Sequence, residues 1–217
     1  MLEKTINSLL PDQPVLVVDA DEVLLQFVTS LEHFFPSKGF ELHLNSFRLQ
    51  GNIFHRGSKD VADTATVKLL LEEFFDECVD TIPAVDGAAD ALHSLSKHFQ
   101  VLILTNIPEH CRARREQSLK QLGMTYPVIA NEGEKGPVVK KISTLSRCPT
   151  AFIDDLPPHH TSVAKHSPST HRIHFIADNR LSKLAPHATD AHSRCYSWPE
   201  ITKYLLKLEG VYHAREH

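Results

Sequence analysis

The sequence is poor in several features that mark special classes of protein. Its four cysteines lie far apart among 217 residues and form no CxxC pair, which argues against a zinc site and a disulfide framework. No apolar run approaches the roughly 20 residues of a membrane-spanning helix. The first residues lack the basic segment and apolar run of a cleaved leader. We therefore expect reduced thiols, no membrane partner and a cytoplasmic location.

Excess charge is also absent. The net charge is −4, from 23 Lys and Arg against 27 Asp and Glu, and no basic cluster with interleaved aromatic residues occurs. Nucleic acid is therefore not an expected partner. Fifteen histidines are many, but none has the spacing of a metal-binding motif such as HExxH. We interpret them as scattered surface and half-buried side chains.

Short apolar runs recur along the chain and alternate with helical patterns. The runs are typical of strands buried on both faces of a parallel sheet, and they occupy residues 15–18, 101–104, 127–130, 151–153 and 172–176. Helices are predicted over residues 88–98, 108–122 and 137–146, with a final helical pattern that ends near Leu208. This alternation predicts an α/β fold with a Rossmann-like, doubly wound parallel sheet.

One segment interrupts the alternation. Residues 28–83 contain no convincing buried strand, but helical patterns run over about 24–35 and 61–79. An insert directly after the first strand predicts an α-helical cap subdomain over the edge of the sheet. We therefore expect a core of residues 1–27 and 84–217, a cap of residues 28–83, and linkers near 26–28 and 82–87.

Polar side chains follow the predicted strands. Asp19 and Asp21 come directly after the first strand, at the carboxyl edge where doubly wound sheets bind ligands. Thr105 and Asn106 end the second strand, just before a predicted helix whose N-terminus favours an anion. Asn106 alone could also be a helix cap. An apolar run followed by DxD is by itself a weak indication of catalysis.

Two later features strengthen this interpretation. Lys135 precedes a Gly-Pro helix start and therefore lies in a loop at the same edge of the sheet. Asp154 and Asp155 are adjacent carboxylates at the end of the fourth predicted strand. Like charges so close are costly unless a cation offsets them, so a metal ion is the simplest explanation.

Taken together, these four sets of residues resemble the four motifs of the haloacid dehalogenase-like hydrolases, in the same order and at the same strand ends. The resemblance covers about residues 15–176. It implies a core with a helical cap between the first and second motifs. The gap between Lys135 and Asp154 is short for the family, so Lys140 and Lys141 are alternative candidates for the lysine.

The resemblance also implies a mechanism. Asp19 would be the nucleophile that forms an aspartyl-phosphate, and Asp21 the general acid and base. Mg²⁺ would be held by Asp19, the backbone carbonyl of Asp21, and Asp154 or Asp155. Thr105, Asn106 and Lys135 would bind phosphate oxygens. Asp21 favours phosphate esters over halides, because a halide leaves without a proton.

The expected substrate is a small phosphorylated metabolite, and the protein is expected to be a monomer or homodimer. Arg48, His55 and Arg56 are the candidate specificity residues of the cap, although a solvated loop face explains them as well. Two alternatives remain open at this point. One is a sugar phosphomutase of the same fold, and the other is a non-catalytic binding or regulatory protein that keeps it.

Overall fold

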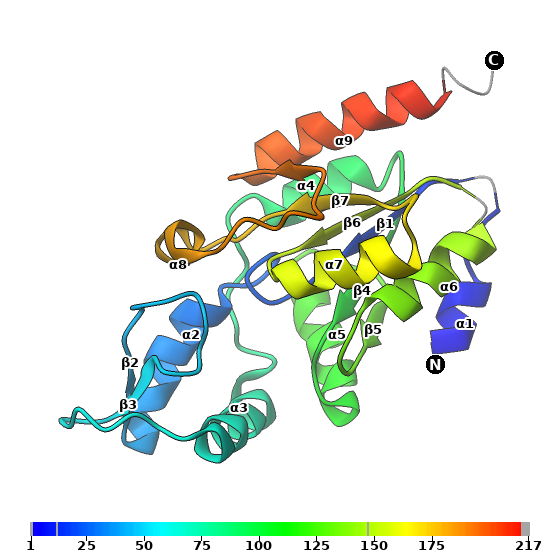
Figure 1. Ribbon diagram of the computed structural model, residues 1–217. Helices are drawn as coiled ribbons and strands as arrows, with labels where there is room; N and C mark the ends of the chain where they lie inside the picture. Colours follow the sequence, from blue (N-terminus) through cyan, green and yellow to red (C-terminus); the bar gives the residue numbers. More distant parts are fainter. Residues whose placement is uncertain (1, 12, 147, 214–217) are drawn as a thin grey trace.

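A six-stranded parallel sheet forms the centre of the protein, of which the computed structural model describes residues 2–11, 13–146 and 148–213. The strands have the order β5-β4-β1-β6-β7-β8 (Figure 1). They are β1 (Val15–Val18), β4 (Gln100–Thr105), β5 (Val128–Ala130), β6 (Thr150–Asp154), β7 (His171–His174) and β8 (Ser193–Arg194). The predicted α/β class with a doubly wound sheet is confirmed; β8 was not predicted.

The path of the chain through the sheet defines where a ligand can bind. From β1 the chain moves outward through β4 to β5, then returns to the other side of β1 and continues through β6, β7 and β8. The winding direction therefore reverses between β1 and β6. Open α/β sheets bind ligands outside the carboxyl ends of the strands at such a point.

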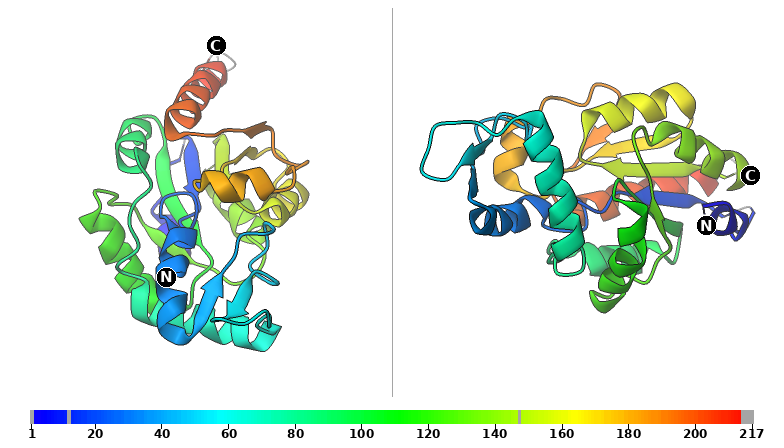
Figure 2. Two further views of the ribbon diagram at one scale, coloured as in Figure 1. Left: turned by 90° about the vertical axis from the view of Figure 1, so that its left-hand side faces the viewer. Right: turned by 90° about the horizontal axis from the view of Figure 1, so that it is seen from below.

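Helices cover both faces of the sheet (Figures 1 and 2). Leu16 and Val18 of β1 face a core shared with α4 and α9, whereas Val15 and Val17 face one shared with α1, α6 and α7. The core helices are α1 (Leu2–Asn7), α4 (Ala88–Leu95), η2 (Glu109–Cys111), α5 (Arg112–Gln121), α6 (Gly136–Ser146), α7 (Pro157–His166), α8 (Asn179–Leu184) and α9 (Trp198–His213). Among the described residues, no helix has the length and apolar composition needed to cross a membrane.

The insert between β1 and α4 is not purely helical. It contains α2 (Phe27–Phe34), η1 (Phe35–Lys38), β2 (Phe40–Leu42), β3 (Ile53–His55) and α3 (Thr64–Cys78). The antiparallel pair of β2 and β3 was not predicted, because each strand has three residues and little buried surface. Figure 1 shows the insert beyond the carboxyl ends of the parallel strands.

The chain enters and leaves the insert through one paired seam. Leu25 forms an isolated antiparallel bridge with Ala84, and the backbone N–H of Gln26 donates to the Pro83 carbonyl at 2.9 Å. The Gln26 side chain adds a bond from Nε2 to the Ala84 carbonyl at 2.8 Å. The two connections are therefore held side by side at the edge of the core.

Candidate active site

Three buried carboxylates meet at the point where the winding direction reverses. Asp19 follows β1, Asp154 ends β6 and Asp155 comes next, and their carboxylate oxygens lie within 4.8 Å of one another. The register brings them together, because Val18 pairs with Ile153 and the N–H of Asp19 donates to the Ile153 carbonyl at 2.9 Å. The structure thus gathers two of the sequence motifs at one place.

Lys135 is the only lysine of the three candidates that reaches this cluster. Its Nζ lies 2.6 Å from Asp19 Oδ1 and 2.7 Å from Asp154 Oδ2, with the side chain 1% exposed. Lys140 and Lys141 are exposed on α6. The residue after Lys135 has to be glycine, because a Cβ at Gly136 would lie 2.3 Å from the Ser162 carbonyl oxygen.

The cluster carries more negative charge than its lysine offsets. Burial raises the pKa of Asp19 to about 7, aided by the charges of Asp154 and Asp21 and opposed by Lys135. Burial also raises the pKa of Asp155 well above its usual range, and the carboxylates of Asp154 and Asp19 add to this. Burial opposes ionisation of Asp154 too, but Lys135 outweighs it and lowers that pKa.

This charge balance is the test of whether a metal ion fits. If all three carboxylates were ionised beside the one ammonium, the buried site would hold two net negative charges. A divalent cation would compensate these two charges, and oxygen ligands suit Mg²⁺. Asp154 has both oxygens engaged, by Lys135 and by the Leu156 N–H. The Asp155 carboxylate accepts no hydrogen bond from the described residues, since His174 Nε2 bonds to the Asp155 backbone carbonyl, so this carboxylate is the more available ligand.

Asp21 lies apart from the cluster and pairs with an arginine that the sequence reasoning missed. Arg115 Nη1 lies 2.8 Å from Asp21 Oδ1, and the arginine side chain is fully buried. Its Nε and Nη2 have no partner among the described residues. Cys111, Arg115 and Leu119 form a buried stripe with a spacing of four residues, so a charged residue in an apolar stripe was the available signal.

Glu22 is a second residue to which no role was assigned. It is the one non-glycine residue with positive φ, 59°, in the described part of the chain. Its carboxylate accepts the N–H of Val28 at 2.7 Å and of Asp178 at 3.0 Å, and burial raises its pKa to about 7 despite these bonds. Glu22 thereby ties the first turn of α2 to the loop before α8.

Thr105 and Asn106 differ in what they offer a phosphate. Thr105 is fully buried, and its Oγ1 has no partner in the described structure. Asn106 does not cap a helix; its amide donates to the Gly133 carbonyl at 2.9 Å and its Oδ1 accepts from Asn131. The predicted helix over 108–122 begins with the 3-10 turn η2, and α5 starts only at Arg112. The helix start is thus farther from Asn106 than expected.

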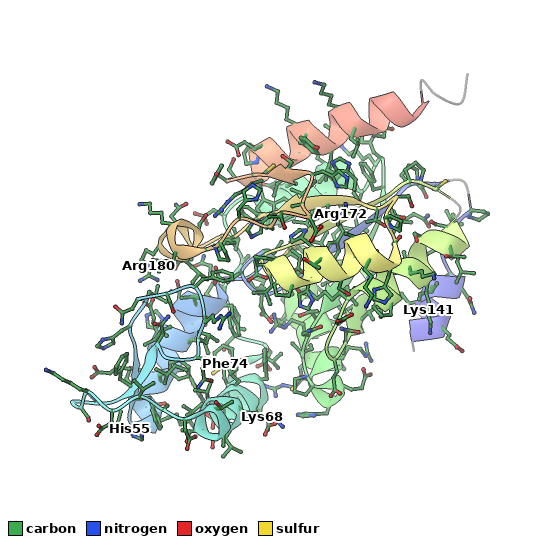
Figure 3. The ribbon with its side chains drawn as sticks, in the orientation of Figure 1. His55, Lys68, Phe74, Lys141, Arg172 and Arg180 are labelled. Atoms are coloured by element: carbon green, nitrogen blue, oxygen red, sulfur yellow. The ribbon has the colours of Figure 1, made fainter. Side chains whose placement is uncertain are left out.

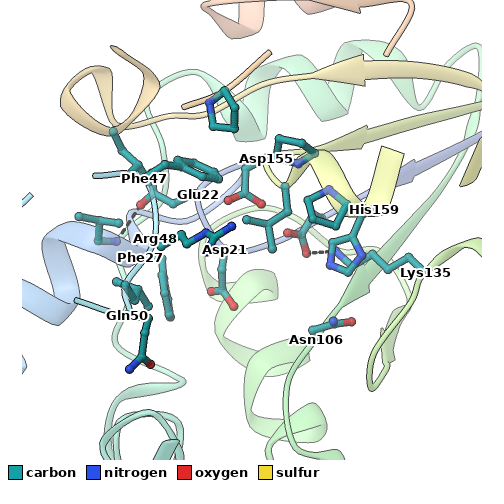
Figure 4. A pocket seen from close by; sticks show the side chains of 18 of the residues that line it. Asp21, Glu22, Phe27, Phe47, Arg48, Gln50, Asn106, Lys135, Asp155 and His159 are labelled. Atoms are coloured by element: carbon teal, nitrogen blue, oxygen red, sulfur yellow. Dashed lines mark hydrogen bonds and ion pairs between the residues drawn. The ribbon is translucent and has the colours of Figure 1, made fainter. Parts of the chain in front are cut away.

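A cavity of about 1050 Å³ joins these residues to the insert. Asp19, Asp21, Lys135 and Asp155 line one end, and side chains of the insert line the other (Figure 4). Arg48 points into it towards Asp21 (Figure 4).

The two other specificity candidates lie outside this cavity lining. The His55 ring contacts the Phe40 ring in a tilted arrangement with centroids 4.7 Å apart, on the hairpin end of the insert (Figure 3). Arg56 is exposed, and its Nε lies 3.8 Å from Glu41 Oε1.

Solved structures share this fold across most of the chain. No family model and no curated protein matches the sequence of this chain. A haloacid dehalogenase-like family hydrolase from Streptococcus pneumoniae is 11% identical, with a TM-score of 0.60 over 89% of this chain and 98% of that one. A HAD family hydrolase from Deinococcus radiodurans, with bound phosphate and sodium, is 14% identical, with a TM-score of 0.59 over 91% and 96%.

The magnesium-bound YfnB protein from Bacillus subtilis is 15% identical, with a TM-score of 0.59 over 90% of this chain and 99% of that one. The sheet and the carboxylate cluster define an α/β protein with three buried carboxylates at the reversal point of its sheet. The likeness to these solved structures shows that the chain has the haloacid dehalogenase-like fold.

Proposed function

We propose that this protein is a Mg²⁺-dependent phosphohydrolase that acts on a phosphomonoester through an aspartyl-phosphate. One observation carries the proposal: three buried carboxylates surround one buried lysine at the end of a cavity that Asp19, Lys135 and Asp155 line, and their full ionisation would leave two negative charges for a cation to compensate. The metal-bound and phosphate-bound proteins of the same fold support it. In this proposal residues 28–83 act as the cap and the rest of the chain as the core.

The proposed chemistry divides the work between two carboxylates. The Asp19 oxygen that does not face Lys135 attacks phosphorus, and the bond from phosphorus to the ester oxygen breaks. Asp21 donates a proton to the departing alkoxide, then takes one from the water that hydrolyses the aspartyl-phosphate. The products are an alcohol and inorganic phosphate, so atoms and charge balance.

The remaining residues bind and balance charge. Asp19, the Asp21 backbone carbonyl and Asp155 would hold Mg²⁺, which supplies positive charge against the repulsion between nucleophile and phosphate. Lys135 keeps Asp19 oriented through a bond of 2.6 Å. The unpartnered Thr105 hydroxyl would donate to a phosphate oxygen.

The test is hydrolysis of p-nitrophenyl phosphate by the purified protein with Mg²⁺ and with EDTA. Activity should require Mg²⁺, and Asp19→Asn should lower kcat by at least about a thousandfold, because no other carboxylate takes the nucleophile's place. Asp90→Asn makes the same chemical change at an exposed position of α4 and should leave kcat unchanged. Equal activity of wild type and Asp19→Asn would refute the proposal.

A further inference from the structure

The end of the cavity away from the carboxylates is mostly apolar. Phe27, Phe47, Leu49 and Leu71 of the insert line it, and Leu156 with the two prolines after it lines the core side. Phe27 is stacked on Phe75 with ring centroids 5.9 Å apart and an interplanar angle of 23°. A substrate bound through its phosphate at the carboxylate end would therefore place its leaving group against aromatic and aliphatic side chains.

Several polar side chains on this lining already have partners. Asn52 Nδ2 donates to the carbonyls of Ser46 and Arg48, each at 2.7 Å. Thr161 Oγ1 donates to Asp190 at 2.6 Å, and the carboxylate of Glu22 accepts two backbone N–H groups. These groups are engaged within the protein. A polyhydroxylated leaving group would lose bonds to water on entry and would find Arg48 and Gln50 as the remaining polar side chains of the insert on this lining, too few to replace bonds to every hydroxyl.

We propose that the substrates of this site are phosphomonoesters of predominantly apolar alcohols, with an alkyl or aryl leaving group of about six or more carbons. The proposal rests on the function proposed above and selects its substrate class. Charge complementarity sets the orientation: the phosphate dianion lies beside Lys135 and the metal site, and the apolar group extends towards Phe47 and Leu71. The volume of about 1050 Å³ accommodates such a group.

Primary alkyl phosphates from methyl to octyl test this with closely similar leaving groups. Burying a methylene changes kcat/KM by up to about fourfold. Because the hexyl chain is longer than methyl by five methylenes, kcat/KM for hexyl phosphate should exceed that for methyl phosphate by up to about a thousandfold. The kcat/KM for hexyl phosphate should also exceed that for a hexitol 6-phosphate, which has the same number of carbons but carries hydroxyl groups. A phosphatase whose kcat/KM is independent of chain length, or that prefers the hexitol ester, would overturn the substrate class and leave the proposed function standing.

Variants connect the effect to the cavity. Phe47→Ala should lower kcat/KM for hexyl phosphate by at least about fivefold more than for methyl phosphate, since it removes apolar contact with the longer chain. Leu69→Ala is the matched control, because Leu69 is 59% exposed and does not line the cavity. Identical chain-length dependence in Phe47→Ala and wild type would also contradict the proposal.

A binding measurement separates the two hypotheses. Alkylphosphonates keep the phosphoryl charge but contain no bond that the reaction breaks, so calorimetry with methyl- and hexylphosphonate in the presence of Mg²⁺ reports binding alone. Tighter binding of hexylphosphonate without hydrolysis of any ester would refute the phosphatase and support the apolar site. Equal binding of the two phosphonates would overturn the apolar site, whatever the activity.

Discussion

The raised pKa of Asp19 predicts that the candidate active site destabilises the metal-free protein at neutral pH. Asp19 has a usual pKa of 3.8 that rises to about 7 in the fold, so folding favours the protonated carboxyl. The stability that this proton confers is fully present below about pH 3.8 and is lost as the pH rises through about 7. Asp19→Asn removes this titration and keeps a side chain of the same shape.

The size of the effect follows from the two pKa values. A tenfold change in proton affinity corresponds to about 1.4 kcal/mol, so the interval from 3.8 to about 7 gives about 4 kcal/mol. In EDTA, the two proteins should have similar unfolding free energies near pH 4, and Asp19→Asn should be more stable by about 4 kcal/mol above pH 7. Comparing the two proteins at each pH cancels the titration of groups that do not interact with Asp19, including the histidines whose pKa values burial lowers. Asp155 and Lys135 interact with Asp19 and do not cancel.

Urea unfolding can be followed through the single tryptophan. Trp198 is 1% exposed, and its indole N–H donates to the Val23 carbonyl at 3.1 Å, so its fluorescence reports on the loop after β1. Mg²⁺ should stabilise wild type more than Asp19→Asn and so narrow the difference in unfolding free energy, because a ligand stabilises the folded state more the tighter it binds and the higher its concentration relative to Kd. A free-energy difference that does not change with pH in EDTA would refute this reasoning.

Two further predictions concern α5 and α6. Arg115→Met should lower kcat for p-nitrophenyl phosphate at least about tenfold, because Asp21 loses the side chain that holds it in position. Arg115→Lys should recover part of the lost kcat, and Arg112→Met on the same helix is the control. Equal kcat in Arg115→Met and wild type would show that the pair does not position the acid. Gly136→Ala should lower the urea unfolding free energy by about 1–3 kcal/mol, because its Cβ would meet the Ser162 carbonyl at 2.3 Å and move α6 from α7. Lys140→Ala at an exposed site of α6 should change the unfolding free energy little. An unfolding free energy of Gly136→Ala equal to that of wild type would contradict the close packing of α6 on α7.

The central strands were predictable because their physics is local. A strand buried on both faces needs consecutive apolar residues, and β1 consists of Val-Leu-Val-Val with all four buried. The carboxyl ends of parallel strands share one edge, so the sequence also indicated that Asp19, Lys135 and Asp154 lie close together. The structure agrees with that grouping, and the fold class is confirmed by the sheet itself.

Features that depend on distant partners were not predictable. Arg115 pairs with Asp21 across 94 positions of sequence, and nothing near either residue specifies the other. The hairpin of β2 and β3 has strands too short for a periodic pattern. Charge in a loop also does not reveal which way a side chain points, so Arg48 was grouped with His55 and Arg56 although only Arg48 lines the cavity.

The paired seam at the base of the insert makes the segment a module that could be exchanged. Gln26 and Pro83 are hydrogen-bonded neighbours although 57 positions separate them, so excision of the chain between them would leave ends that already meet. Closing such a gap needs only a short turn and costs little chain entropy, since the loop it replaces is longer. The sheet and its carboxylates could therefore be retained while inserts of different composition are placed above them.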